Sequence, residues 1–173
     1  MKKGFTMVEL LASIVILGLL LVLTIPSYTS VMNNMKSSSL SGVVSEIEIA
    51  ARKYGNSIKD EVKNSANSCV ITNVDSLIQK GLLESDDKHS NVIYNPKDKT
   101  ALNDNIYICY DTVEYKINTY YVFNFNSNKI YEKNMYVLDN DKLYECVIKY
   151  PGKGGIDGIN KNNKKYFKLI KSF

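Results

Sequence analysis

Hydrophobic and polar positions change their spacing twice along this chain of 173 residues. Residues 10–25 contain no charged side chain. Between residues 40 and 62 the apolar residues recur at spacings of three and four, the period of an amphipathic helix. After about residue 90, apolar and polar residues alternate, which is the period of a strand. The pattern therefore predicts an apolar helix, an amphipathic helix and a sheet, in that order.

The amphipathic segment carries one continuous apolar stripe, while charged residues such as Glu46, Glu48, Arg52 and Lys53 occupy other positions. Such a stripe usually packs on the core of its own domain. We expect one long helix from residue 5 to about residue 63, with Gly55 as a candidate bend and residues 64–68 as its end. The stripe consists of Leu40, Val43, Val44, Ile47, Ala50, Ala51, Tyr54, Ile58 and Val62.

The remainder of the chain is rich in aromatic and β-branched residues, which sheets favour. Eleven of the 13 tyrosines lie after residue 90. We expect a short helix over residues 75–79, and turns at 118–119, 127–128 and 139–141. Strands are expected over residues 92–94, 106–110, 115–117, 120–125, 129–132, 136–138, 143–150 and 166–170. The predicted fold class is α+β, with a long N-terminal helix packed on an antiparallel sheet.

Lys2 and Lys3 precede the apolar segment, as in an export signal. The residues directly after residue 25 contain no Ala-x-Ala cleavage site, and no cysteine stands close enough for lipoprotein cleavage, so we expect the segment to be retained. As a helix, residues 5–25 would be about 32 Å long, close to the ~30 Å hydrocarbon core of a bilayer. The two lysines favour a cytoplasmic N-terminus and an external remainder.

Glu9 interrupts the apolar segment near its start. A carboxylate deep in a bilayer costs about 2.5–3.5 kcal/mol on insertion scales, and less near the interface. Two interpretations stay open: Glu9 lies at the headgroup boundary, or it has a positively charged partner within the membrane.

The string GFTMVELL, which begins at Gly4, resembles the signal of type IV prepilins, a signal that pseudopilins and competence pilins share. The resemblance includes the short basic leader, Gly4 before the cleavage point, Phe5 after it, Glu9 as the fifth mature residue, and Pro26 after the apolar segment. It implies that a prepilin peptidase cuts between Gly4 and Phe5 and N-methylates Phe5. It also implies that Glu9 pairs with the N-terminal amine of a neighbouring subunit during assembly, because a buried charge is tolerable when it is paired.

The same resemblance implies the domain organisation of a pilin lollipop. The leader is residues 1–4, the transmembrane or filament-core helix 5–26, the amphipathic half of the helix 27–66, and the α+β head 67–173. In filaments of related pilins the helix loosens between positions that correspond here to Gly18 and Pro26. The composition, rich in Asn, Lys, Ile and Tyr, suggests a Gram-positive source.

As a type IV pilin, the chain would be a single-pass membrane protein before assembly and part of an extracellular pilus afterwards. Its expected partners are other pilin subunits, prepilin peptidase and the pilus assembly machinery of the membrane. Adhesion, motility or a related process would be its role. The alternative is a minor pilin, or a competence or secretion pseudopilin, whose head binds DNA or a host-surface ligand.

The three cysteines allow one disulfide and one free thiol, and an exported protein favours the disulfide. The pairs 69–109, 69–146 and 109–146 all stay open. Cys109 and Cys146 lie in strand-like segments where they can face each other across the sheet, and they are the pair that we expect.

The net charge of +4 is unevenly distributed, since residues 149–173 alone carry seven lysines and one acid. Such a tail contacts DNA phosphates in one interpretation and protects a solvated strand edge in the other, which we favour. The tail lysines concerned are Lys161, Lys164, Lys165, Lys168 and Lys171.

Other candidate chemistry is sparse. His89 has no partner in the pattern, and Asp139 and Asp141 supply too few oxygens for calcium. The sequence holds no nucleophile elbow, zinc-type cysteine pair or paired catalytic carboxylates. We therefore expect neither enzymatic activity nor a metal or other cofactor.

Overall fold

The computed structural model describes residues 7–87, 89–152, 158–160 and 163–173, without the side chains of residues 17–38. The long helix α1 (Met7–Ser57) is followed by the short helices α2 (Lys59–Asn64), η1 (Ala66–Ser68), α3 (Val74–Gln79) and η2 (Lys164–Tyr166). The strands are β1 (Cys69–Thr72), β2 (Asn105–Asp111), β3 (Lys116–Asn124), β4 (Tyr136–Asp139), β5 (Lys142–Cys146) and β6 (Phe167–Ser172). The predicted α+β class is confirmed.

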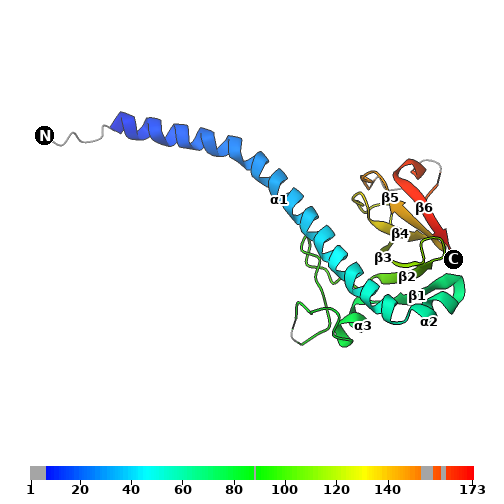
Figure 1. Ribbon diagram of the computed structural model, residues 1–173. Helices are drawn as coiled ribbons and strands as arrows, with labels where there is room; N and C mark the ends of the chain where they lie inside the picture. The colour runs from blue at the N-terminus through cyan, green and yellow to red at the C-terminus, as the bar shows by residue number, and fades with distance from the viewer. Residues whose placement is uncertain (1–6, 88, 153–157, 161–162) are drawn as a thin grey trace.

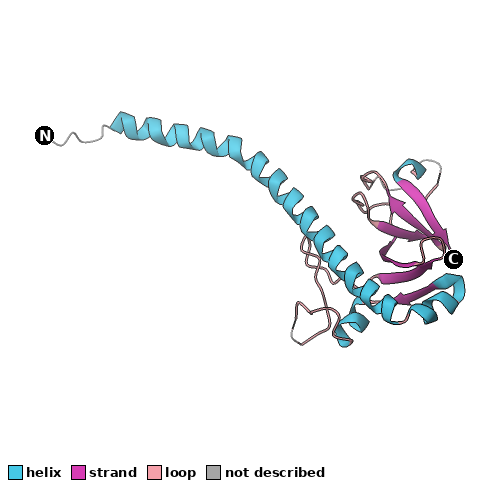
Figure 2. Ribbon diagram, viewed as in Figure 1, coloured by secondary structure: helices cyan, strands magenta, loops and turns pink. Residues whose placement is uncertain are grey.

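Helix α1 extends away from the sheet at its N-terminal end and lies against the sheet only toward its C-terminal end (Figure 1). All six strands gather on one side of that C-terminal part (Figure 2). The expected long helix is therefore present, although it ends at Ser57 and a separate helix, α2, continues the path to Asn64.

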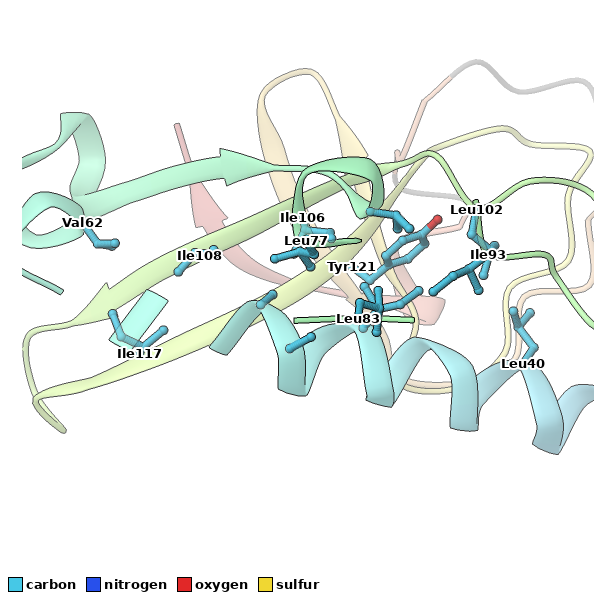
Figure 3. Close-up of a cluster of buried hydrophobic side chains, with 14 of the residues drawn as sticks. Leu40, Val62, Leu77, Leu83, Ile93, Leu102, Ile106, Ile108, Ile117 and Tyr121 are labelled. Carbon is cyan, nitrogen blue, oxygen red and sulfur yellow. The ribbon is translucent and has the colours of Figure 1, made fainter. Parts of the chain in front are cut away.

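The expected apolar stripe of α1 and α2 forms the main core with β2, β3 and α3. All nine stripe residues belong to this core: five are buried and four are partly buried. Figure 3 shows the core side chains between helix and sheet, from Leu40 at one end to Val62 and Ile117 at the other. The three-and-four spacing thus identified the packed face correctly, because the helical period fixes which positions share a face.

Gly55 was expected to bend the helix, but α1 continues past it to Ser57. Its role is close approach to the sheet. A Cβ at this position would overlap with Ile108 Cγ2 of β2 and lie 2.9 Å from Ile117 Cγ2 of β3.

The sheet follows chain order, β1-β2-β3-β4-β5-β6, and one of its pairs departs from the expected antiparallel arrangement. Strands β3 and β4 are parallel, with Val122 opposite Tyr136. Parallel neighbours need a longer connection than a hairpin turn, and residues 125–135 provide it. The strand predicted within this connection is wrong: Tyr131 forms only an isolated bridge with Tyr150.

Several predicted boundaries differ from the structure. The strands predicted over 115–117 and 120–125 are one strand, β3, and the hairpin turn lies before it. Asn118, expected in a turn, instead donates its Nδ2 to Asp111 Oδ2 across the hairpin, at 3.2 Å. The strand predicted over 92–94 is reduced to a bridge between Tyr94 and Ala101, and β1 was not predicted at all.

The missed strand explains an error in the expected disulfide. Cys69 of β1 stands opposite Cys109 of β2 in the ladder, and these two cysteines are bonded. The expected pair of Cys109 with Cys146 is wrong, because Cys146 ends β5, three strands away from β2 in the sheet order. Cys146 is a buried free thiol whose Sγ donates to the Ile148 carbonyl at 3.1 Å.

The sheet is strongly curled. In a flat sheet, five strand spacings of about 4.8 Å would separate the two edge strands by about 24 Å. Here the ring of Phe173, just after β6, lies 4.8 Å from the ring of Tyr107 on β2. Lys171 of β6 also reaches the Asn67 carbonyl beside β1, at 2.6 Å. The right-handed twist of strands favours such coiling, and here it brings the two edges of the sheet together.

Candidate functional site

The predicted processing and assembly residues all belong to the N-terminal part of the chain. Gly4 and Phe5 lie outside the described residues. Gly18 and Pro26 lie within α1, which is continuous through both positions, although the Pro26 side chain is not among those described. Glu9 is described, and it lies in the first turn of α1.

Seven of the first ten residues of α1 carry large apolar side chains that are exposed. Their exposed fractions run from 56% to 82%, whereas a helix on the surface of a soluble domain usually has a polar face. Contiguous apolar exposure of this kind marks a surface that another molecule or a membrane covers. This surface is the part of the apolar segment whose side chains the structure describes: it consists of Met7, Val8, Leu10, Leu11, Ile14, Val15 and Ile16.

Glu9 is the acidic exception on the apolar segment. It lies in the first turn of the helix, where the positive end of the helix dipole attracts an acidic side chain. The Ser13 hydroxyl donates to the Glu9 carbonyl at 2.7 Å, one helical turn away. Glu9 therefore presents a charge among side chains that exclude water once they are covered.

Within the described part of the chain, no helix reaches the length and mean hydropathy of a membrane span. The predicted span over residues 5–26 lies partly outside that part. It stays a prediction, as do the domain boundaries.

A partly buried carboxyl group, that of Glu48, joins α1 to the head. The Tyr121 N–H of β3 donates to Glu48 Oε1, and the Thr119 hydroxyl donates to the Glu48 carbonyl, both at 3.0 Å. Burial raises the pKa of the Glu48 carboxyl, and the bond from Tyr121 and the charge of Arg52 only partly oppose this. The sequence pattern placed Glu48 on the polar side of the helix. In the sequence, the contact of Glu48 with the sheet was signalled only by its position directly after Ile47, a residue of the apolar stripe.

The head has a groove of about 690 Å³ beside Leu40, between the segment before β2 and the connection from β3 to β4. Its half-buried carboxyl group is Asp104, whose Oδ2 accepts from the Tyr121 hydroxyl at 3.2 Å. Burial raises the pKa of both groups. Lys97, Asp98 and Lys129 also line the groove, so its charge is mixed. Its volume suits a small ligand, but its side chains select no ligand class.

The tail lysines that the structure describes differ in their exposure. Lys164, Lys165 and Lys168 are exposed, Lys161 lies outside the described residues, and Lys171 is half-buried against β1. Strand β6 is an edge of the sheet, where exposed lysines discourage pairing with another chain. Among the described side chains there is no group of three or more His, Cys, Asp or Glu that could hold a metal ion. The expected absence of a metal stays a prediction.

Comparison with known proteins bears on the N-terminal segment alone. Residues 1–25 match the family model of the prokaryotic N-terminal methylation motif. Neither the curated proteins nor the solved structures give a match. The motif suggests a membrane-anchored form that later joins a pilus, with prepilin peptidase and other pilin subunits as partners. The match to this motif supports identification of the chain as a type IV pilin-like prepilin, a substrate of prepilin peptidase.

Proposed function

We propose that this chain is a structural subunit of a type IV pilus, with the lollipop arrangement of a pilin. A prepilin peptidase cuts it between Gly4 and Phe5 and methylates the new N-terminus. The subunit then leaves the membrane and enters a surface filament. The observation that carries this proposal is the apolar segment of α1, with Glu9 as its acidic residue, extending away from a folded head (Figure 1).

The apolar segment has to be covered at every stage. Burying a large apolar side chain is worth about 1.5–3 kcal/mol, so seven of them contribute on the order of 10 kcal/mol relative to water. Lipid covers them before assembly and neighbouring helices cover them afterwards. Because lipid is as apolar as a helix surface, the step from membrane to filament gains little from the hydrophobic effect. Packing and a specific polar pair must therefore drive that step.

Glu9 supplies one member of that pair. Cleavage creates an α-amine, whose reference pKa of ~7.7–8.0 keeps it mostly protonated at neutral pH. In a water-excluded filament core, the amine of one subunit and the Glu9 carboxylate of the next neutralise each other. Leaving either charge alone would cost about 3–5 kcal/mol. The pair therefore sets the axial register between neighbouring subunits.

Processing is tested by Gly4→Arg in cells that contain the peptidase. We expect the variant to keep residues 1–4, because the small residue before the cut is replaced by a large one. Gly42→Arg is the matched control, since Gly42 lies on an exposed part of α1 with open space around it. The intact mass of the accumulated chain distinguishes the two. A Gly4→Arg chain cut at the same position as the control would contradict the proposed processing.

The second candidate function is a minor pilin or pseudopilin whose head binds DNA. The exposed lysines Lys164, Lys165 and Lys168 favour it. If all three bind phosphates, replacing them with alanine should weaken DNA binding. A plot of the logarithm of the DNA association constant against the logarithm of the salt concentration should then have a slope that is less steep by about 0.9 for each phosphate that is no longer neutralised. An unchanged slope excludes this role for the three lysines.

A further inference from the structure

The disulfide of the head has a lysine beside it that comes from the opposite edge of the sheet. Lys171 of β6 places its Nζ 3.1 Å from Cys69 Sγ and donates to the Asn67 carbonyl at 2.6 Å. Cys69 opens β1, and β1 and β6 are the two edge strands in the sheet order. The contact therefore exists only when the curled sheet is complete.

The two cysteines of the disulfide differ in their exposure to solvent. Cys109 lies in the central part of β2 and is only 5% exposed, whereas Cys69 is partly exposed at the sheet edge. In thiol–disulfide exchange, the rate depends on which sulfur can be reached. An external reagent therefore reaches Cys69 more easily than Cys109. Cys109, the bonded partner of Cys69, is close enough to attack Cys69 in the following step.

The Lys171 ammonium has only partial compensation for its burial. Desolvation lowers the pKa of Lys171, and Asp111 of β2 opposes this only as the smaller effect. Of the other titratable groups near Cys69, Tyr107 of β2 packs in the same cluster, and burial raises the pKa of its phenol, so it stays neutral. When the disulfide is open, a thiolate on Cys69 would be the negative charge next to the ammonium. A neighbouring lysine favours the thiolate form of a cysteine.

We propose that Cys69 is a thiol–disulfide exchange site and that Lys171 activates it once β6 has docked. The substrate is a disulfide-bearing oxidant. The Cys69 thiolate attacks one oxidant sulfur, and the other leaves as a thiolate. The Cys109 thiol then loses its proton to solvent, and its sulfur attacks Cys69 Sγ, which releases the first oxidant sulfur. The two cysteines lose two electrons, and the oxidant disulfide becomes two thiols.

This arrangement couples oxidation to completion of the fold. Strand β6 is the last strand in chain order, and the disulfide joins β1 to β2. A head in which β6 has not yet docked lacks the ammonium, so its Cys69 reacts as an ordinary thiol. A completed head reacts faster, and the disulfide then fixes the edge against which β6 is packed.

The test uses the full chain in detergent micelles, reduced and then freed of reductant under nitrogen. Oxidised glutathione is the probe, and peptide masses after acid quenching report Cys69, Cys109 and Cys146 separately. Replacing Lys171 with methionine should slow oxidation at neutral pH by about threefold. A tenfold loss of thiolate is partly offset because a more basic thiolate is a better nucleophile. The pH at which Cys69 alkylation is half-maximal should rise in the same variant.

Lys168→Met is the matched control, since Lys168 lies on the same strand but is exposed and stands opposite Glu145. It should react like the wild type, and Lys171→Arg should restore most of the rate because it keeps the charge. Equal rates and equal pH profiles for Lys171→Met and Lys168→Met would overturn the proposal. If Lys171→Met fails to fold, the wild type decides: its Cys69 must be alkylated at lower pH in the folded chain than in urea, and identical profiles overturn the proposal.

Discussion

Gly55 allows α1 to approach the sheet closely, and substituting it tests how tightly α1 packs on β2 and β3. In Gly55→Ala, the new methyl would overlap with Ile108 Cγ2 and lie 2.9 Å from Ile117 Cγ2. Both neighbours are β-branched residues in strands, Ile108 is fully buried and Ile117 nearly so, and neither can rotate away freely.

The magnitude follows from two opposed effects. Overpacking of a well-packed core costs typically about 1–3 kcal/mol. We expect a cost near the upper end of this range, because the new methyl would clash with two side chains that cannot move away freely. Replacing glycine with alanine in a helix interior returns about 1 kcal/mol. Gly55→Ala should therefore lower the free energy of unfolding by about 2 kcal/mol. For a chain of this size, that corresponds to a fall in melting temperature of about 4–8 °C.

Gly42→Ala is the control with the opposite expected sign. Gly42 lies in the same helix with nothing within 4 Å of its would-be Cβ, so alanine should stabilise the protein by up to about 1 kcal/mol. Thermal and urea unfolding of the two variants and the wild type, followed by the near-ultraviolet signal of the head tyrosines, measures both effects. If Gly55→Ala proves as stable as Gly42→Ala, the close packing of α1 on β2 and β3 is wrong.

Two further predictions concern the head. Because burial raises the pKa of Glu48 in the folded state, the folded chain binds more protons than the unfolded one, and stability should fall as the pH rises from the ordinary glutamate pKa toward the raised one. Glu48→Gln should flatten this fall in urea unfolding across that pH range, whereas the exposed Glu46→Gln should keep it. Cys109→Ala opens a loop of 40 residues and should cost about 4 kcal/mol. Cys146→Ala should keep the disulfide, and loss of the disulfide mass in that variant would contradict the pairing.

The fold was predictable where a period fixes a face. The stripe along α1 and α2 was found because helical spacing alone determines which side chains meet the core. Strand β1 has four residues, and its pairing with β2 stabilises it more than any local preference does. Missing it led directly to the wrong disulfide, since the register of Cys69 opposite Cys109 is a property of the pairing.

The hairpin and crossover depend on side-chain bonds that have no simple sequence signature. The turn between β2 and β3 contains no glycine, and Tyr115 adopts a φ of 54° there. The Asp111 carboxylate holds the turn by accepting from the Val113 and Glu114 N–H groups. The crossover to β4 is fixed by the Tyr131 hydroxyl, which accepts from the Asn126 N–H at 2.7 Å. These bonds span only two to five residues, yet the pattern of apolar and polar positions does not indicate them.

The features of the candidate site also differ in whether the sequence could reveal them. The methylation motif was readable because it is local and spans residues 1–25, while the roles of the individual processing and assembly residues stay predictions. The attachment of Glu48 to β3 and the contact of Lys171 with Cys69 join positions more than 70 residues apart. No pattern within a short window indicates either of them.

Incorporation of a Glu9→Ala subunit into surface filaments tests the central claim most directly. The variant should be cut to the same mature mass as the wild type, because the cleavage point is intact, yet it should be strongly depleted from purified filaments in cells that also make the wild-type chain. Glu46→Ala, an exposed acid-to-alanine change farther along α1, should be incorporated normally. Equal incorporation of the Glu9→Ala and Glu46→Ala subunits would contradict the pairing of Glu9 with a neighbouring N-terminal amine, and with it the proposed mechanism of assembly.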